Sequence, residues 1–393
     1  MHVSLKASNA RYIPGLNTLR VYAALSVVVG HVHEFIPGWF LIDVNTGILR
    51  NLTLTGGGAV LLFYVLSGFL LTSILLSDKQ RQPIKPLRFY ERRLRRLVPA
   101  YYLVLAVTAG VSIATAPDYG IVFGRQFNAL QYPATALFAA FIPLALNSVS
   151  GMISHFWSLS VEVIFYGLLP WVVRARFVPL TFGLVIGLRL LLLALTPVES
   201  PLHQIVLYLK VDALALGGLA ACLWHYRRAA VERTLTTRPA RIGLLVVLGL
   251  LIVAEVPAHV VWMDYAMTLV FAWLILNISA GHFVIENRFV RWLGNLTYGI
   301  YLWHMLALFI VGASGMAGVR VYPAVFGIAL ALAYVTYQLI ERPILGERRP
   351  QAAPPRRTLP REMEGGKALA DIANVKLHVC RLTKNVTVKI NIP

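Results

Sequence analysis

Two ionisable residues bracket an apolar stretch near the start of the chain. In "RVYAALSVVVGH", Arg20 and His31 flank ten small or apolar residues. Eleven helical residues turn through about 1100° and rise about 16 Å, so both side chains would share one helix face, about half a hydrocarbon core apart. His33 and Glu34 follow directly and complete a titratable cluster. An imidazole titrates near neutral pH, which makes His31 a candidate general base, whereas Arg20 could bind an anion or simply anchor the helix.

A second apolar stretch, "SHFWSLSVEVIFYGLLP", contains a lone carboxylate. His155, Ser158 and Glu162 stand at i, i+3 and i+7 and can share one helix face. An ionisable side chain within a membrane span costs on the order of 3 kcal/mol or more, so Glu162 requires a partner. A histidine or arginine from another helix is expected, with the cluster around His31 as the natural candidate.

The stretch "FYVLSGFLL" places Ser67 and Gly68 in the middle of another apolar run. Ser67 could act as a nucleophile only with a base beside it. A small-residue patch that lets two helices pack closely is the favoured interpretation.

Arginines gather in "RFYERRLRRLVPAYY". Arg92, Arg95 and Arg96 stand at i, i+3 and i+4 and share a helix face, with Arg93 between them. Grouped guanidinium groups suit phosphates, and attraction to anionic lipids is the alternative explanation.

Two further stretches, "LKVDALALGG" and "YGIYLWHM", place polar residues among apolar ones. Lys210 and Asp212 are two residues apart, on different helix faces, so they are not expected to pair with each other. Tyr301 and His304 are three apart and do share a face. Each of these residues suits a structural role as well as a functional one.

The composition indicates the elements that must position these residues. Of the 393 residues, 58% are hydrophobic and only 13% are charged, which is too apolar for a soluble domain. We therefore predict an all-α polytopic membrane protein with about ten transmembrane helices. The predicted spans are residues 17–36, 57–77, 97–116, 156–173, 177–196, 204–224, 242–258, 261–281, 293–314 and 320–340.

The net charge of +19 could suggest a nucleic-acid partner, but the basic residues lie in the short segments between spans. That placement is typical of cytoplasmic loops beside anionic lipids, so we expect membrane lipids and no nucleic acid as partners, with both termini in the cytoplasm. Residues 130–146 are apolar enough for an eleventh span, but an eleventh span would place the basic loops that follow on the outer side of the membrane. A re-entrant or interfacial segment is preferred there.

The two ends of the chain and its two cysteines bear on how the chain is organised into domains. We expect a membrane-embedded domain over residues 1–343 and a basic, Pro-rich, disordered cytoplasmic tail over residues 344–393. No cleavable signal peptide is expected. Cys222 and Cys380 have no motif spacing, so neither a disulfide framework nor a metal site is predicted.

Together, these stretches resemble the acyltransferase-3 superfamily of membrane O-acyltransferases. The resemblance runs from "IPGLNTLRVYAALSVVVGHVHEF" to "YQLIERPI" and rests on six motifs in the right order, the stretches quoted above among them. It implies ten spans with both termini inside and transfer of an acyl group, often acetyl, from cytoplasmic acyl-CoA to a hydroxyl. The acceptor is usually a sugar of a cell-surface or secreted molecule, so a glycan or glycolipid acceptor and the bacterial inner membrane are expected.

The resemblance also assigns residues. Arg20 and His31 match the first-span pair of the family, and Glu162 matches the glutamate of "WSLSVE". The family's basic loop is matched by Arg92, Arg93 and Arg96. Lys210 departs from the arginine often found at its position, which puts a bidentate contact in doubt. Some members carry an additional extracytoplasmic hydrolase-like domain, which we do not expect here.

These assignments give a candidate site for acyl transfer without a metal. His31 would be the general base, oriented by Glu162 or Glu34, and arginines at the inner rim would bind the coenzyme A head. Transfer needs no covalent enzyme intermediate, although a route through Ser67 is an alternative. The candidate substrate-binding residues are His33, His155, Trp157, Ser67, Asp212 and His304.

Two other functions remain open from the sequence. A proton-coupled transporter for a small solute would also use histidine and glutamate within spans and arginine at a gate. The chain lacks the paired hydrophobic halves often seen in such carriers. The same transfer chemistry could also serve a non-glycan acceptor, such as an antibiotic sugar or a lipid.

Overall fold

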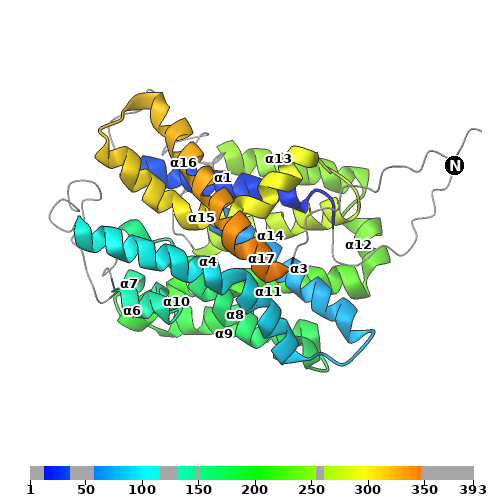
Figure 1. The fold of residues 1–393 in the computed structure, drawn as a ribbon. Helices are drawn as coiled ribbons and strands as arrows, with labels where there is room; N and C mark the ends of the chain where they lie inside the picture. Colours follow the sequence, from blue (N-terminus) through cyan, green and yellow to red (C-terminus); the bar gives the residue numbers. More distant parts are fainter. Residues whose placement is uncertain (1–12, 36–56, 116–130, 147–150, 254–260, 347–393) are drawn as a thin grey trace, which may run out of the picture. The chain divides into compact units, whose positions relative to one another are not determined.

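The computed structural model describes residues 13–35, 57–115, 131–146, 151–253 and 261–346. These residues form helices joined by short connections and contain no strand, which confirms the all-α fold (Figure 1). The chain divides after Gly346 into two units. The predicted tail beyond that residue lies outside the described residues.

The helices and helical turns are, in chain order, α1 (Leu16–Phe35), α3 (Gly58–Lys79), α4 (Pro86–Ala114), α6 (Gln131–Ala136), α7 (Phe141–Ala145), η1 (Gly151–Ile153), α8 (Phe156–Arg174), α9 (Val178–Leu195), α10 (Pro201–Tyr208), α11 (Val211–Tyr226), α12 (Arg228–Thr234), α13 (Arg238–Val253), α14 (Val261–Ser279), α15 (Arg288–Ala313), η2 (Gly318–Arg320), α16 (Val321–Thr336), the π-helical turn η3 (Tyr337–Glu341) and α17 (Arg342–Leu345).

Length and hydropathy allow most of these helices to cross a membrane. Eight helical segments of the described part qualify, or nine if α12 and α13, bent by 73° at their junction, form one span. Helix α1 has 20 residues but more polar side chains, and it is not among them. The chain is therefore a multi-pass membrane protein, as predicted. The cytoplasmic placement of its termini stays a prediction.

Two predicted boundaries differ from the structure. Helix α4 begins at Pro86, eleven residues before the predicted span, so the arginine-rich stretch is helical rather than a loop. Proline is favoured in the first helical turn, where its missing N–H is not needed. The predicted span 204–224 falls within the candidate span Pro201–Tyr226, which consists of two helices, α10 and α11, with a break at Leu209 and Lys210.

The segment around residues 130–146 does not form a spanning helix where it is described. It contains the six-residue α6 and the five-residue α7, and the three-residue turn η1 follows. A helix of six residues is about 9 Å long, far short of the hydrocarbon thickness of about 30 Å. The structure thus agrees with the preference for a segment that does not cross.

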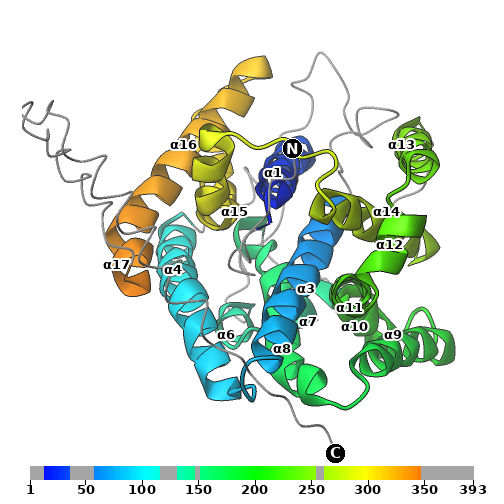
Figure 2. The ribbon, with the colours of Figure 1, turned by 90° about the vertical axis from the view of Figure 1, so that its right-hand side faces the viewer.

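Helix α3 lies among the other long helices, with α4 and α8 to one side and α11 and α14 to the other (Figure 2). Its closest neighbour is α11. A Cβ atom added to Gly68 would fall 2.0 Å from the backbone oxygen of Leu214, and one added to Gly217 would fall 2.3 Å from that of Val65. Gly68 therefore belongs to a small-residue packing patch, as the sequence indicates.

Helices α1 and α15 run side by side in the same direction. At the start of α1, the carboxylate of Glu286 accepts hydrogen bonds from the backbone N–H of Gly15 (2.6 Å) and the side-chain amide of Asn17 (3.3 Å). Toward the other end, His31 lies 3.0 Å from His304, measured between the ring nitrogens. The two contacts hold one face of α1 against one face of α15 along most of its length.

The close approach of α3 and α11 predicts a sharp difference between glycines. Gly68→Ala should cost about 1–3 kcal/mol of stability, because the new methyl group overlaps the backbone of α11. Gly110→Ala on α4 is the matched control, because its Cβ would meet nothing within 4 Å. Thermal unfolding in detergent measures both. Equal unfolding temperatures for the two variants would contradict the packing described here.

Candidate functional site

A cavity of about 240 Å³ lies where α1, α3, α4, α8 and α15 meet. One part of its wall is apolar and formed mainly by aliphatic side chains of α1 and α3. The other part is unusually polar for the interior of a membrane protein. Its polar lining consists of Asn17, Arg20, Tyr64, Ser67, Arg93, Arg96, Ser158, Glu162, Tyr166, Thr297, Tyr298 and Tyr301.

Glu162 on α8 is held by neighbours from other helices. The hydroxyl of Ser67 on α3 donates a hydrogen bond to its carboxylate, and Tyr166 is also within hydrogen-bonding reach. Arg20 and Arg93 supply positive charge close enough to interact with it. Among the described residues, Glu162 is thus hydrogen-bonded to Ser67 and Tyr166 and interacts with the arginines electrostatically, without an ion pair. The expectation that Glu162 orients His31 is wrong, because its hydrogen bonds are made at the cavity.

The arginines of α4 separate into two groups. Arg93 and Arg96, one turn apart, line the cavity. Arg92 points instead to Asp78, with 3.8 Å between its guanidinium and the carboxylate, and Arg95 pairs with Glu91 at 2.6 Å. The face that meets the cavity is thus not the predicted Arg92, Arg95 and Arg96 face. Arg92, which was expected to bind the donor, lies outside the cavity.

His31 lies beyond the cavity rather than in its wall. Its Nδ1 atom is 3.0 Å from Nε2 of His304 on α15, and the ring of His304 lies 4.8 Å from that of His155. Three of the predicted site residues therefore meet in one histidine cluster, defined here as His31, His155 and His304. Arg20 lines the cavity but His31 does not, so these two residues of one helix do not face the same cavity.

Tyr301 and Ser158 lie between the cavity and the histidine cluster. Both line the cavity. The Tyr301 hydroxyl donates to the carbonyl oxygen of His155 at 2.9 Å and lies 2.5 Å from the Ser158 hydroxyl. The shared face predicted for Tyr301 and His304 is confirmed, with one residue at the cavity and the other in the cluster. The cluster is thus separated from the cavity by a single layer of side chains.

The other candidates on α1 and α8 lie outside the cavity wall. Buried His33 is hydrogen-bonded to the hydroxyl of Tyr322 on α16, and Glu34 is exposed. Trp157 packs edge to face against Tyr64 and Tyr208, with ring centroids 6.4 Å and 5.7 Å apart. The substrate contacts proposed for His33 and Trp157, and the orientation of His31 by Glu34, stay predictions.

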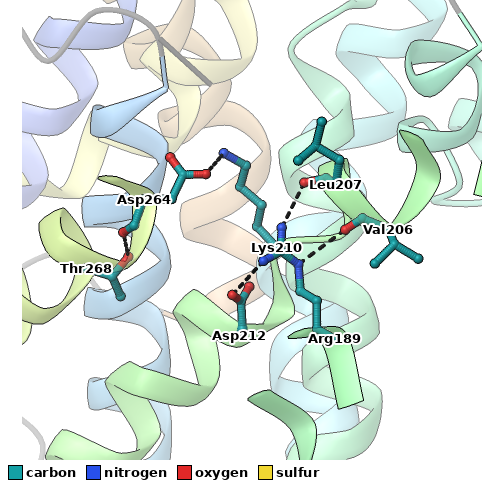
Figure 3. Close-up of polar contacts among 7 residues, drawn as sticks. All are labelled: Arg189, Val206, Leu207, Lys210, Asp212, Asp264 and Thr268. Atoms are coloured by element: carbon teal, nitrogen blue, oxygen red, sulfur yellow. Dashed lines mark hydrogen bonds and ion pairs between the residues drawn. The ribbon is translucent and has the colours of Figure 1, made fainter. Parts of the chain in front are cut away.

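Lys210 and Asp212 lie at the break between α10 and α11 and do not pair with each other, as predicted (Figure 3). Lys210 forms an ion pair with Asp264 on α14 at 2.5 Å. Asp212 pairs with Arg189 on α9 at 2.7 Å. Arg189 also donates to the carbonyl oxygens of Val206 (3.2 Å) and Leu207 (3.0 Å), which the end of α10 leaves without helical partners.

Sequence reasoning missed two residues of these networks. Arg189 is the only charged residue in the span 178–195, a signal as strong as the one that identified Glu162. Tyr166 stands four residues after Glu162, on the same face, and lines the cavity beside it. Asp212, predicted to bind substrate, instead has its side chain 6% exposed against Arg189 and outside the cavity.

The buried Arg189–Asp212 pair yields a stability prediction. Asp212→Asn should destabilise the protein by about 3–5 kcal/mol, because it leaves the Arg189 charge buried without its partner. A double variant, Arg189→Met with Asp212→Leu, should be less destabilised than the single one.

The exposed pair formed by Arg228 and Glu232 supplies the control, since Glu232→Gln should change stability by no more than about 1 kcal/mol. Thermal unfolding in detergent measures all three variants. An Asp212→Asn protein with unchanged stability and weakened acceptor binding would instead place Asp212 in a substrate site.

Comparisons with known proteins agree with the resemblance seen in the sequence. The O-acetyltransferase OatA of Staphylococcus aureus (strain NCTC 8325 / PS 47) is 25% identical, over 86% of this chain and 58% of that protein. The putative peptidoglycan O-acetyltransferase YrhL of Bacillus subtilis (strain 168) is 27% identical, over 86% of this chain and 56% of that protein. The chain thus spans less than two thirds of the length of these relatives. No solved structure matches it.

The model of one protein family, described as an acyltransferase domain, matches residues 13–338. This range includes every helix that contributes to the cavity and to the histidine cluster. The chain therefore belongs to the acyltransferase-3 family.

Proposed function

We propose that this protein is a membrane O-acyltransferase that transfers an acyl group, in the first instance acetyl, from acyl-CoA to a hydroxyl of a glycan. Family membership supports the acyl transfer. The printed names of the relatives, O-acetyltransferase and putative peptidoglycan O-acetyltransferase, support an acetyl group and a glycan acceptor. The bacterial relatives support a bacterial inner membrane, and the positive-inside pattern supports an orientation with the arginine-rich end of α4 on the cytoplasmic side.

The observation that carries the donor assignment is the set of guanidinium groups at the cavity. Arg20, Arg93 and Arg96 come from two helices and face the same space. Glu162 is the one carboxylate among the residues of its wall, so the cavity has an excess of positive charge. Charge-assisted hydrogen bonds from arginine suit phosphate oxygens, which coenzyme A supplies.

Arg93 adds a second indication of an anionic ligand. Its Nε atom is buried and has no hydrogen-bond partner among the described residues. A buried donor left without a partner costs about 1–3 kcal/mol, a penalty that a bound phosphate would remove. The cavity volume of about 240 Å³ is below the ~300–1,000 Å³ typical of pockets for drug-sized ligands, so it would enclose part of the donor rather than all of it.

The transfer itself needs a base for the acceptor hydroxyl. As the acceptor oxygen attacks the thioester carbonyl, a C–O bond forms, the C–S bond breaks, and the hydroxyl proton passes to the imidazole of His31. The proton then goes to the departing thiolate of coenzyme A. Since Tyr301 and Ser158 lie between the cavity and the histidine cluster, the acyl end must pass these two side chains to meet His31.

Ser67 offers a competing route within the same function. It lines the cavity and donates to Glu162, an arrangement in which a carboxylate could accept the proton of an attacking serine. Transfer would then proceed through an acyl-serine ester, with Glu162 as the base. A radiolabelled acetyl group trapped on the protein would distinguish this route from direct transfer.

The donor site predicts a selective effect of two arginines. Arg93→Gln and Arg96→Gln should each raise the KM for acetyl-CoA roughly 10- to 100-fold, since loss of one charge-assisted hydrogen bond corresponds to about 1.5–3 kcal/mol. The KM for the acceptor should change little. Coenzyme A release by purified protein in detergent, with a peptidoglycan fragment as acceptor, measures both constants.

Arg95→Gln is the matched control, because Arg95 lies on the same helix, is exposed, and pairs with Glu91 rather than lining the cavity. Its KM should equal that of the unaltered protein. Equal increases for Arg95→Gln and Arg93→Gln would show a general charge effect and contradict a donor site in the cavity. Absence of coenzyme A release with any acceptor would favour the alternative function, a proton-coupled transporter of a small solute.

The role of His31 predicts loss of the chemical step. His31→Ala should lower kcat by about 10²–10⁴-fold, the typical contribution of a general base, while the protein still inserts and unfolds at a similar temperature. His225→Ala on α11 is the control, because that imidazole lies on another helix against Tyr226. Retained transfer by the His31 variant, with label trapped on Ser67, would replace direct transfer by the covalent route.

A further inference from the structure

We propose that His304 is a positioning residue that fixes the tautomer of His31, so that Nε2 of His31 is unprotonated and can accept the proton of the acceptor hydroxyl. The inference deepens the proposed function and rests on it for its catalytic meaning. It follows from two hydrogen bonds that link a backbone carbonyl to His304 and His304 to His31. Neither residue lines the cavity described above.

The first hydrogen bond sets the proton on His304. Its Nδ1 atom lies 2.6 Å from the carbonyl oxygen of Tyr301, one turn earlier in α15. A carbonyl oxygen can only accept, so Nδ1 must carry the hydrogen. A neutral imidazole has a single N–H, which leaves Nε2 of His304 as an acceptor.

The second hydrogen bond transmits this choice to His31. Nε2 of His304 and Nδ1 of His31 are 3.0 Å apart, within the range of an N–H···N contact. Because Nε2 of His304 has only a lone pair to offer, the hydrogen between the two atoms belongs to Nδ1 of His31. The hydrogen-bond network thus assigns an Nδ1–H tautomer to His31, with Nε2 bare.

The surroundings keep His304 neutral and fixed. Its side chain is buried, with the residue only 1% exposed, and a charge there would require a compensating partner. Its ring packs 4.8 Å from that of His155, whose Nε2 lies 3.2 Å from the carbonyl oxygen of Leu302. Both imidazoles are therefore tied to the backbone of α15 at consecutive residues, Tyr301 and Leu302.

Besides His304, two groups act on His31: the backbone carbonyl of Val27, one turn earlier in α1, which is hydrogen-bonded to the imidazole, and Glu34. Glu34 lies on the same helix, is exposed, and interacts with the imidazole electrostatically. The ring of Phe35 also stacks near that of His31, at 6.1 Å. The side-chain hydrogen bond that orients His31, however, goes to His304. An imidazole thus takes the place that a carboxylate occupies in most triads.

The Nδ1–H tautomer of His31 sets the path of the proton during acyl transfer. The acceptor hydroxyl gives its proton to Nε2 of His31 while its oxygen forms the new ester bond and the thioester C–S bond breaks. During that step the Nδ1–H of the His31 imidazolium remains bonded to His304. Nε2 then returns the proton to the thiolate of coenzyme A, so that His31 regains its starting tautomer.

The test reads the tautomer directly and does not depend on activity. Protein labelled with ¹⁵N-histidine in nanodiscs gives separate NMR signals for protonated and bare ring nitrogens, and the His31→Gln variant identifies those of His31. The unaltered protein should show Nδ1 protonated and Nε2 bare at His31. His304→Ala should lose this pattern in favour of Nε2–H, and its kcat should fall about 10²-fold with an unchanged KM for acetyl-CoA.

Two amide variants separate positioning from packing. In His304→Gln the side-chain oxygen can reach the place of Nε2 and accept from His31, so the tautomer and most of kcat should be retained. In His304→Asn the amide is one carbon shorter and cannot reach, so both should be lost. Similar unfolding temperatures would show that both variants keep the fold.

Each outcome decides a separate claim. An Nε2–H signal for His31 in the unaltered protein, or a tautomer unchanged by His304→Ala, would overturn the role of His304 whatever the activity. Equal kcat values for His304→Gln and His304→Asn would also overturn it. A tautomer that responds as expected in a protein that releases no coenzyme A would instead overturn the proposed function and leave the hydrogen-bond assignment standing.

Discussion

Helix α1 is held against α15 by hydrogen bonds near both of its ends, and the placement of the functional residues depends on that pairing. Glu286 binds the first turn of α1, and His304 meets His31 near the last. Between these contacts the two helices run parallel. Arg20 is thereby directed into the cavity, while His31 lies about three turns further along, in the histidine cluster. The separation of the arginines proposed to bind the donor from the proposed base, His31, follows from this geometry.

The same constraint, that polar groups within an apolar bundle need partners, shapes the rest of the interior. Glu162 is satisfied by Ser67 and by nearby arginines, and Asp212 by Arg189. Pairs of this kind are formed between helices, so they fix how the helices sit against one another. Nε of Arg93 has no hydrogen-bond partner among the described residues, and the proposal of an anionic ligand in the cavity rests in part on it.

Relations within one helix could be predicted from the sequence, because the helical repeat alone determines them. The spans, the shared face of Tyr301 and His304, and the failure of Lys210 to pair with Asp212 are examples. Contacts between residues of different helices could not be predicted from the sequence, because they depend on tertiary packing. The assignment of Glu162 to His31 was wrong for that reason, and the sequence could not show that Arg92, unlike Arg93 and Arg96, lies outside the cavity. The break at Lys210 was missed because the apolar run 204–224 does not itself show that Arg189, on another helix, binds the carbonyl oxygens freed at the break.

The central claim is that the cavity between α1, α3, α4, α8 and α15 binds the acyl donor. An experimental structure of the protein in nanodiscs with coenzyme A would test it most directly. The account predicts phosphate density against the guanidinium groups of Arg20, Arg93 and Arg96, with the thiol arm directed toward Tyr301. Coenzyme A bound on the outer face of α4 beside Arg92, with lipid in the cavity, would contradict the account.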